Sequence, residues 1–171
     1  MSLPHTAGHI AASAGGYEPQ RKNNFMLYLT PKGGGDSATI ELSLSKFPFP
    51  KETTESQAID YLNEQRKVAG KSTYEGFALA LKDYVDQQTA QVIRGWRRAV
   101  FNPLTGETGL AKNYKSDGFL HLFAPDGSSV RKWKLVGVWP SDFAMGEGDM
   151  TSAEPVEITC TLQVDYIDME V

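Results

Sequence analysis

The 171-residue sequence contains a single cysteine, Cys160. One cysteine excludes an internal disulfide and a cysteine-rich metal site. The sequence also lacks any apolar run close to the ~20 residues that a membrane-spanning helix needs. Its first 16 residues have neither a cationic start nor an unbroken apolar stretch, so we expect no secretory signal. These absences favour a soluble protein with no membrane span.

Basic residues are not in excess, because 17 Lys and Arg stand against 21 Asp and Glu, for a net charge of −4. This balance argues against a protein that binds nucleic acid over its whole surface. The 40% hydrophobic and 22% charged shares are ordinary for a globular chain. The length predicts about one domain. We expect an N-terminal arm, rich in Ala, Gly, Ser and Asn, over residues 1–24 and a single domain over 25–171.

No pattern that carries catalytic chemistry is complete in this sequence. The segment Ala69–Ser72 ends like a phosphate-binding loop, but Gln65 stands where that motif requires its first glycine. His5 and His9 have a spacing suited to sharing a metal, yet no third ligand lies nearby. Cys160 lies on the apolar side of a predicted strand, where a thiol acts as a small hydrophobe. We therefore expect no enzyme, no cofactor and no metal.

Alternation of apolar and polar residues predicts several half-buried strands. The segments with this pattern are 40–45, 77–82, 119–124 with 130–138 as a hairpin, and 156–166. The last of these has the clearest alternation in the chain. Segment 58–69 remains ambiguous, because its composition favours a helix while its apolar stripe is broken.

One helix is predicted, over about residues 86–101. Asp86 is a suitable capping residue at its start, and Asn102-Pro103 ends it. Arg94 and Arg98 lie on the face opposite the apolar stripe. They belong to one of two basic clusters, Arg94, Arg97 and Arg98 in the helix and Arg131, Lys132 and Lys134 in a strand. Such cations can contact the phosphates of a nucleic acid, but we interpret both clusters as solvated or interface faces. An acidic surface on a neighbouring copy is an alternative partner for them.

Half-polar strands, one flanking helix, an arm and no active site together favour a protein that assembles. Closing a sheet into a ring removes its exposed edges.

The order of the motifs in the second half of the chain adds a family resemblance. The segments that carry it are Ile93–Trp96, Tyr114, Phe119–Phe123 with Pro125–Gly127, Leu135–Pro140, Ser141–Met150 and Val156–Tyr166. Over about residues 20–170, this order resembles that of the tail tube proteins of contractile bacteriophages. Tyr61–Glu64 and Ala69–Lys71 are similar to the strand and glycine turn that precede the helix in that family.

The resemblance implies a mainly β fold, in which two packed antiparallel sheets form a β-barrel-like sandwich with one flanking helix. It implies that segments 58–69 and 73–84 are paired strands. It also implies a hexameric ring with a continuous inner β-barrel, and rings stacked into a hollow tube. Such a tube houses a tape-measure protein, is surrounded by a sheath, and lies between baseplate and tail-terminator proteins. It conducts DNA into the host without sequence-specific binding. The expected location is the tail of a virion assembled in the bacterial cytoplasm.

Within such a tube, polar faces of inner strands line the channel. Glu157 and Asp165 are the candidate lining residues, and Glu41 is a weaker one. An acidic or neutral wall would repel DNA phosphates, so that the genome slides without sticking.

The contacts of the tube with its neighbours have their own candidates. We expect the loop over 47–57 to contact the next ring, and Arg94 and Arg98 to face the sheath. The candidate ring contacts are Phe47, Phe49 and Glu52. The loop can instead pack against its own domain, and the N-terminal arm is a second contact candidate.

Two alternatives remain open. The chain can be the tube protein of a secretion system or a phage-like injection particle, or it can be a monomeric β-barrel that binds a small ligand. A ligand-binding barrel stays a monomer with an apolar pocket, whereas a tube protein assembles.

Overall fold

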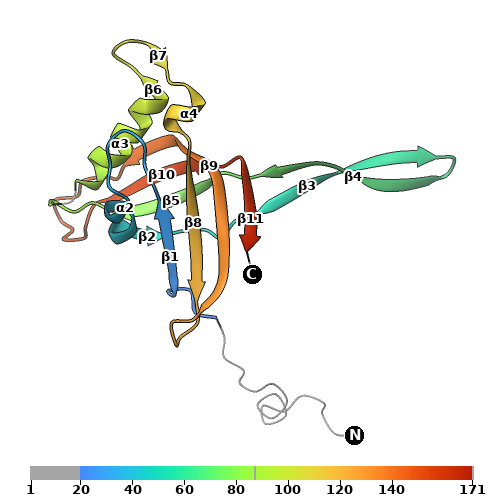
Figure 1. Cartoon of the computed structure of the whole chain (residues 1–171), viewed down its shortest axis with the longest axis horizontal. Helices are drawn as coiled ribbons and strands as arrows, with labels where there is room; N and C mark the ends of the chain where they lie inside the picture. Colours follow the sequence, from blue (N-terminus) through green and yellow to red (C-terminus); the bar gives the residue numbers. More distant parts are fainter. Residues whose placement is uncertain (1–19, 87, 171) are drawn as a thin grey trace, which may run out of the picture.

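The structure is a computed structural model that describes residues 20–86 and 88–170, and most of it is β-strand (Figure 1). The strands are β1 (Phe25–Leu29), β2 (Leu44–Lys46), β3 (Glu52–Tyr61), β4 (Glu64–Tyr74), β5 (Phe77–Lys82), β6 (Phe101–Asn102), β7 (Glu107–Thr108), β8 (Ser116–Phe123), β9 (Ser129–Met145), β10 (Glu157–Gln163) and β11 (Tyr166–Glu170). The helices are α2 (Ser37–Ser43), α3 (Thr89–Val100) and α4 (Ala111–Tyr114). His5, His9 and most of the expected arm lie outside the described residues.

A seven-stranded antiparallel sheet forms the body, with six strands in the order β1-β8-β9-β10-β5-β2 and the seventh, β11, paired with β9. The long strand β9 joins its two halves. The first part of β9 pairs with β8 and β11, and its last part pairs with β10. The sheet curls on itself and encloses the core, which confirms the mainly β, barrel-like fold (Figure 1).

The core is built by the predicted alternation, because every second residue of a strand points to the same side. Leu79 and Leu81 of β5 meet Ile158, Cys160 and Leu162 of β10 inside the curl. From the other half of the sheet come Leu27, Leu29, Leu120 and Leu135, each almost fully buried. Helix α3 adds Ile93 and Trp96, both completely buried, and so closes one end of the core.

The start of the long helix differs from the prediction. Helix α3 begins at Thr89, and Asp86 lies exposed in the preceding turn. The backbone N–H of Ala90 in the first turn donates instead to the Asp83 carboxylate, over 3.5 Å. Buried Thr89 and Ser43 share a hydroxyl hydrogen bond of 2.7 Å that ties α3 to α2. An acidic residue near the helix start was the right signal, but the residue in contact is three positions earlier.

The strand predicted over 40–45 is wrong for most of its length. Residues Ser37–Ser43 form α2, and Asp36 caps that helix by accepting from the Ala38 backbone N–H over 3.2 Å. Ile40 and Ser43 are buried, which is the three-residue spacing of a helix face. The alternation fitted both periods, and the Asp36 cap decides between them. Helices α2 and α4 add to the one helix that was expected.

Segment 58–69 is extended, as the family resemblance implied, but its partner differs. Strands β3 and β4 pair with each other, from Glu52↔Tyr74 to Tyr61↔Glu64, so 58–69 is the far end of one hairpin. Strand β5 pairs with β10 and β2 instead. The hairpin projects far from the body (Figure 1). None of the helices within residues 20–86 and 88–170 has the length and apolar character to cross a membrane.

The long strand predicted over 156–166 is interrupted before its end. Strand β10 stops at Gln163, and β11 begins at Tyr166. The interruption reverses the alternation, because Val164 and Ile167 are buried while Tyr166 is 48% exposed. The prediction that Tyr166 belongs to the apolar face is therefore wrong.

Candidate assembly interfaces

The outer half of the β3–β4 hairpin has one uncovered apolar face. The register places Ile59, Tyr61 and Val68 on the same side, together with the polar residues Gln57, Glu64 and Arg66. The exposed fractions of the three apolar side chains are 54%, 66% and 44%. The opposite side carries Ala58, Asp60, Gln65 and Lys67 and is polar. A two-stranded ribbon is marginal by itself in water, so this apolar face needs a partner.

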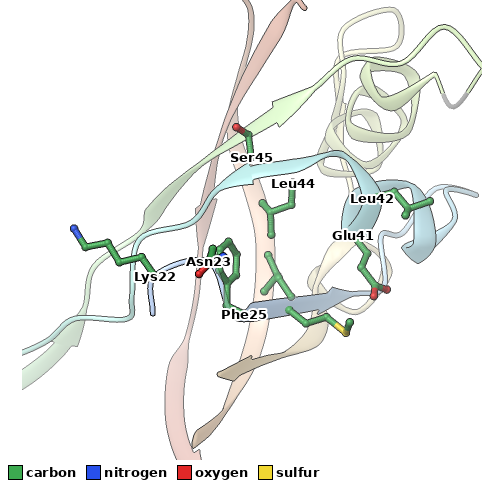
Figure 2. A pocket seen from close by; sticks show the side chains of 9 residues that line it. Lys22, Asn23, Phe25, Glu41, Leu42, Leu44 and Ser45 are labelled. Carbon is green, nitrogen blue, oxygen red and sulfur yellow. The ribbon is translucent and has the colours of Figure 1, made fainter. Parts of the chain in front are cut away.

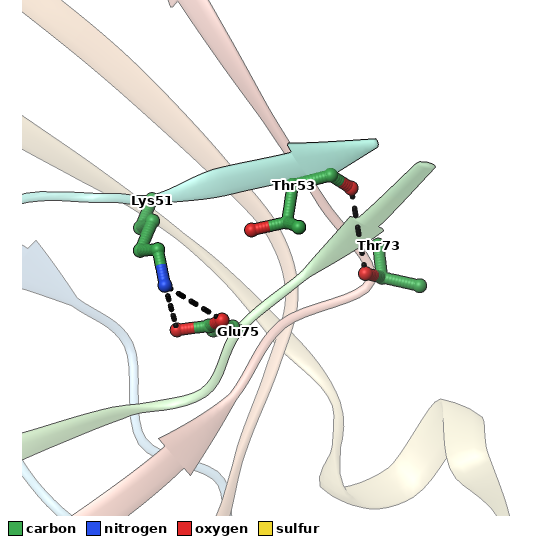
Figure 3. A network of polar contacts seen from close by, with 4 residues as sticks. All are labelled: Lys51, Thr53, Thr73 and Glu75. Atoms are coloured by element: carbon green, nitrogen blue, oxygen red, sulfur yellow. Dashed lines mark hydrogen bonds and ion pairs between the residues drawn. The ribbon is translucent and has the colours of Figure 1, made fainter. Parts of the chain in front are cut away.

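Polar contacts fix the hairpin where it leaves the body (Figure 3). The Lys51 ammonium donates to both carboxylate oxygens of Glu75, at 2.8 and 3.0 Å. Next to it, the Thr73 hydroxyl donates to the Thr53 carbonyl over 3.4 Å. Both charged groups of the ion pair are more than half exposed, so the pair adds little stability.

A groove separates the two ends of the curled sheet, and Figure 2 shows it between β1 and the α2–β2 segment. Strand β1 pairs only with β8, and β2 only with β5, among the residues that the structure describes. Phe25, Leu42 and Leu44 line the groove, with Lys22 and Glu41 at its rim. The hollow measures about 610 Å³. Free strand edges beside apolar side chains are suited to contact with another chain.

The outward face of β10 and β5 is polar and has small side chains. Glu157, Thr159 and Thr161 alternate with buried residues along β10. Ala78 and Ala80 lie opposite the two threonines on β5. The Glu157 carboxylate is 3.7 Å from the Lys46 ammonium, and both side chains remain largely exposed. Lys82 lies opposite Glu157 in the register, so this face carries charges of both signs.

The other two candidate lining residues have different surroundings. Asp165 lies in the interruption between β10 and β11, where both of its carboxylate oxygens accept from Lys115 at 2.7 Å. Glu41 is half-buried on helix α2 beside the edge groove, so the strand face on which we expected it does not exist. The structure therefore brings neither onto the polar face that carries Glu157.

The three candidate ring contacts of the 47–57 loop have different surroundings. Phe47 packs against its own core, with its ring 5.0 Å from that of Phe77. Phe49 is 48% exposed and lies 6.1 Å from the Trp133 ring. Glu52 begins β3, so the protruding segment is mostly strand rather than loop. Sequence reasoning missed Ile59, Tyr61 and Val68, whose common face becomes visible only once the strand register is known.

Both basic clusters are exposed in part, with different neighbours. Arg94 and Arg98 are exposed on α3. In the strand cluster, Lys132 pairs with Glu170 at 2.7 Å and lies 4.5 Å from the centre of the Phe119 ring. Lys132 therefore already has an ion-pair partner and an aromatic contact within its own chain.

Three aromatic residues from the segments that carry the resemblance, Trp96, Tyr114 and Trp139, lie together beside α3. The Trp96 indole N–H donates to the Tyr114 carbonyl over 2.7 Å, and the Tyr114 ring meets that of Trp139 edge to face at 5.7 Å. These contacts join α3 to α4 and to β9, so this part of the motif has a structural role.

Burial raises the pKa of the Cys160 thiol to about 12, so the thiol is a poor nucleophile. Among residues 20–86 and 88–170, no group of three His, Cys, Asp or Glu is placed to hold a metal ion.

The sequence matches no protein-family model and no curated protein. Its fold, by contrast, is similar to solved structures. A chain of the anti-feeding prophage cap, a tube-terminating cap, superposes with a TM-score of 0.73 at 15% identity, covering 94% of this chain and 97% of that one. A chain of the sheath–tube complex of the extracellular contractile injection system PVC gives 0.66 at 16% identity, covering 98% and 99%.

A more distant similarity is to an Hcp protein, with a TM-score of 0.51 at 10% identity over 85% of this chain and 91% of that one. Identities this low establish a common fold. The protein therefore has the mainly β fold of the tube proteins of contractile injection systems.

Proposed function

We propose that this protein is the subunit of a hollow tube in a contractile tail or injection apparatus. Copies close into a hexameric ring with a continuous inner β-barrel, and rings stack. The observation that carries the proposal is the β3–β4 hairpin, which projects from the body with Ile59, Tyr61 and Val68 uncovered. The free edges of β1 and β2 support ring closure. The 6-fold symmetrised anti-feeding prophage baseplate contains a chain of the same fold, with a TM-score of 0.69.

In this tube, the polar face of β10 and β5 lines the channel. Glu157, Thr159 and Thr161 lie on this wall with Lys82, Ala80 and Ala78 opposite them. Such a wall would bind a nucleic acid weakly, because Lys46 and Lys82 lie beside the Glu157 carboxylate and the two strands offer no aromatic stacking surface there. The hairpin, rather than Phe47, makes the contact between rings.

The apparatus that the tube serves has two versions. In a phage tail, the tube would house a tape-measure protein, contact sheath, baseplate and terminator proteins, and conduct DNA into the host. In an injection particle, the same architecture would lack a genome. The higher similarity to the anti-feeding prophage and PVC chains than to the Hcp chain favours a tail-like apparatus with a sheath. Nucleic-acid content of particles isolated through this chain separates the two versions.

Negative-stain electron microscopy across protein concentrations, with light scattering on the same samples, tests the proposal. We expect hollow rings or tubes at high concentration. A chain that stays monomeric, even when given preformed seeds, would overturn the proposal. The groove of about 610 Å³ between β1 and β2 would then be the first place to screen for a small ligand.

A further inference from the structure

Three arginines surround a hollow at the C-terminal end of α3. Arg94, Arg97 and Arg98 line it from the helix, and the rings of Phe101 and Phe143 complete it. The hollow measures about 300 Å³. We call it the arginine hollow. It combines a concentrated positive charge with two aromatic surfaces.

The three guanidinium groups have no carboxylate partner within the described part of the chain. Even Asp142, which lines the same hollow, makes no ion pair there. The helix dipole favours cations in this last turn, and this explains why Arg97 and Arg98 are tolerated side by side. The dipole does not occupy the N–H donors of the guanidinium groups. A guanidinium group can donate two parallel hydrogen bonds to one carboxylate. The hollow is thus complementary to an acidic ligand.

The same chain presents an acidic segment with matching chemistry. Residues 146–156 connect β9 to β10, and all of them are exposed. We call this segment the acidic loop. It carries Glu147, Asp149 and Glu154, while Met150 between them is fully exposed. The backbone N–H and hydroxyl of Thr151 donate to Asp149 at 2.9 and 2.7 Å and lower the pKa of that carboxyl, so Asp149 is ionised at neutral pH.

The sequence around the arginine hollow is rich in basic residues, and the sequence around the acidic loop is rich in acidic ones. Residues 88–134 hold eight Lys and Arg against three Asp and Glu. From Leu135 to Val171 there are eight Asp and Glu and no Lys or Arg. Of the acidic residues after Lys134, Glu157, Asp165 and Glu170 already pair with lysines of the same chain, whereas those of the acidic loop form no ion pair within the described residues.

We propose that the arginine hollow of one copy receives the acidic loop of a second copy. In this contact, Glu147 and Asp149 pair with the arginines, and the Met150 thioether lies against the two phenylalanine rings. The contact joins two different surfaces, so it repeats from copy to copy, as a ring or a stack requires. The inference rests on the proposed tube function, and it replaces the expectation that Arg94 and Arg98 face the sheath.

Disulfide trapping tests this contact directly. A chain carrying Arg98→Cys is mixed with a chain carrying Met150→Cys under mild oxidation, and we expect a mixed covalent dimer. The matched control mixes Met150→Cys with Lys112→Cys, because Lys112 is an exposed cation outside the hollow. Buried Cys160 does not compete. A yield of mixed dimer no higher than that of the control would overturn the proposal.

A chain carrying both cysteines separates contact between copies from contact within one. We expect a ladder of covalent oligomers, whereas an internal disulfide in a monomer would overturn the proposal. Rings seen by electron microscopy without enrichment of the mixed dimer would reject this contact and leave the tube function standing. Enriched mixed dimers without rings or tubes would support the contact and reject the tube function.

Charge exchange provides a second test that does not depend on a disulfide. The reversal Arg94→Glu with Arg98→Glu should raise the concentration needed for self-association by about tenfold or more. The reversal Glu147→Lys with Asp149→Lys should do the same, and an equimolar mixture of the two reversed chains should recover much of the loss. Unchanged self-association of both reversed chains would overturn the proposal and leave the sheath as the partner of the arginines.

Discussion

The backbone N–H of Gly137 donates a hydrogen bond to the Asp117 carboxylate across two strands, over 3.1 Å. Gly137 has a φ of +71°, a value that residues with a side chain rarely adopt. It lies where β9 leaves its partners β8 and β11 and continues to β10. Asp165 also contacts β9 here, because its backbone N–H donates to the carbonyl of Val136, the residue before Gly137, over 3.0 Å. This bend lets one strand belong to both halves of the curled sheet.

Replacing Gly137 by alanine should therefore destabilise the fold more than an ordinary glycine replacement. A Cβ at this position would collide with the Asp165 carboxylate and push it away from Lys115. We expect a loss of about 2–4 kcal/mol in the free energy of unfolding, measured by urea denaturation.

The matched control for this bend is Gly127→Ala. Gly127 has a similar φ of +83°, but nothing lies within 4 Å of the position of its Cβ. The Gly127→Ala variant should lose about 1–2 kcal/mol in the free energy of unfolding, which is the cost of placing a residue with a Cβ in the left-handed backbone conformation. Equal losses at the two positions would show that contact with Asp165 does not matter.

The pH response of Glu170 provides a test of the β9–β11 edge. The hydrogen bond from Lys132 lowers the pKa of this carboxyl below its ordinary value. Because the pKa is lower in the folded state, the ionised Glu170 carboxylate stabilises the fold at pH values above its pKa in the unfolded chain. This stabilisation is lost as the pH falls through the pKa of the folded state. NMR titration should show a pKa for Glu170 below that of an ordinary glutamate, and Lys132→Gln should move it upward. An unchanged pKa in that variant would contradict the contact.

The fold could be predicted from the sequence where burial alone decides the structure. The alternation in 77–82 and in the first part of 156–166 correctly identifies β5 and β10, because one side of each strand meets the core. It fails at α2, where residues 40–43 of the predicted strand lie in a helix that Asp36 caps. It also fails at the interruption before Tyr166, since a backbone irregularity changes which side is buried without changing the composition.

The candidate interfaces were less predictable than the core. Ile59 and Tyr61 share a face by alternation along β3, but Val68 joins them only through the β3–β4 register. The arginines of α3 were visible in the sequence, but the two phenylalanine rings beside them come from β6 and β9. Surfaces made by segments distant in sequence need the pairing of the strands to be known first.

The reactivity of Cys160 should report opening of the core. Its thiol is completely buried, and burial raises its pKa to about 12. Thiolate is the reactive form, so a thiol reagent at pH 8 should modify the native protein very slowly and the urea-unfolded protein rapidly. Mass spectrometry of the labelled protein measures both rates. Rapid modification of the folded protein would show that β10 opens locally.

The hairpin offers the sharpest test of assembly, because two adjacent residues on β4 lie on its opposite faces. Val68 belongs to the apolar face with Ile59 and Tyr61, whereas Ala69 belongs to the polar face. Both positions are exposed in the single chain, so Val68→Lys and Ala69→Lys should each leave the thermal unfolding of the monomer nearly unchanged. Burying a valine in a contact between copies is worth about 1.5–3 kcal/mol. Val68→Lys should therefore raise the concentration at which tubes form, measured by light scattering and electron microscopy, by about tenfold or more. Ala69→Lys should have a much smaller effect. If the two variants assemble alike, the apolar face of the hairpin is not the surface that joins one copy to the next.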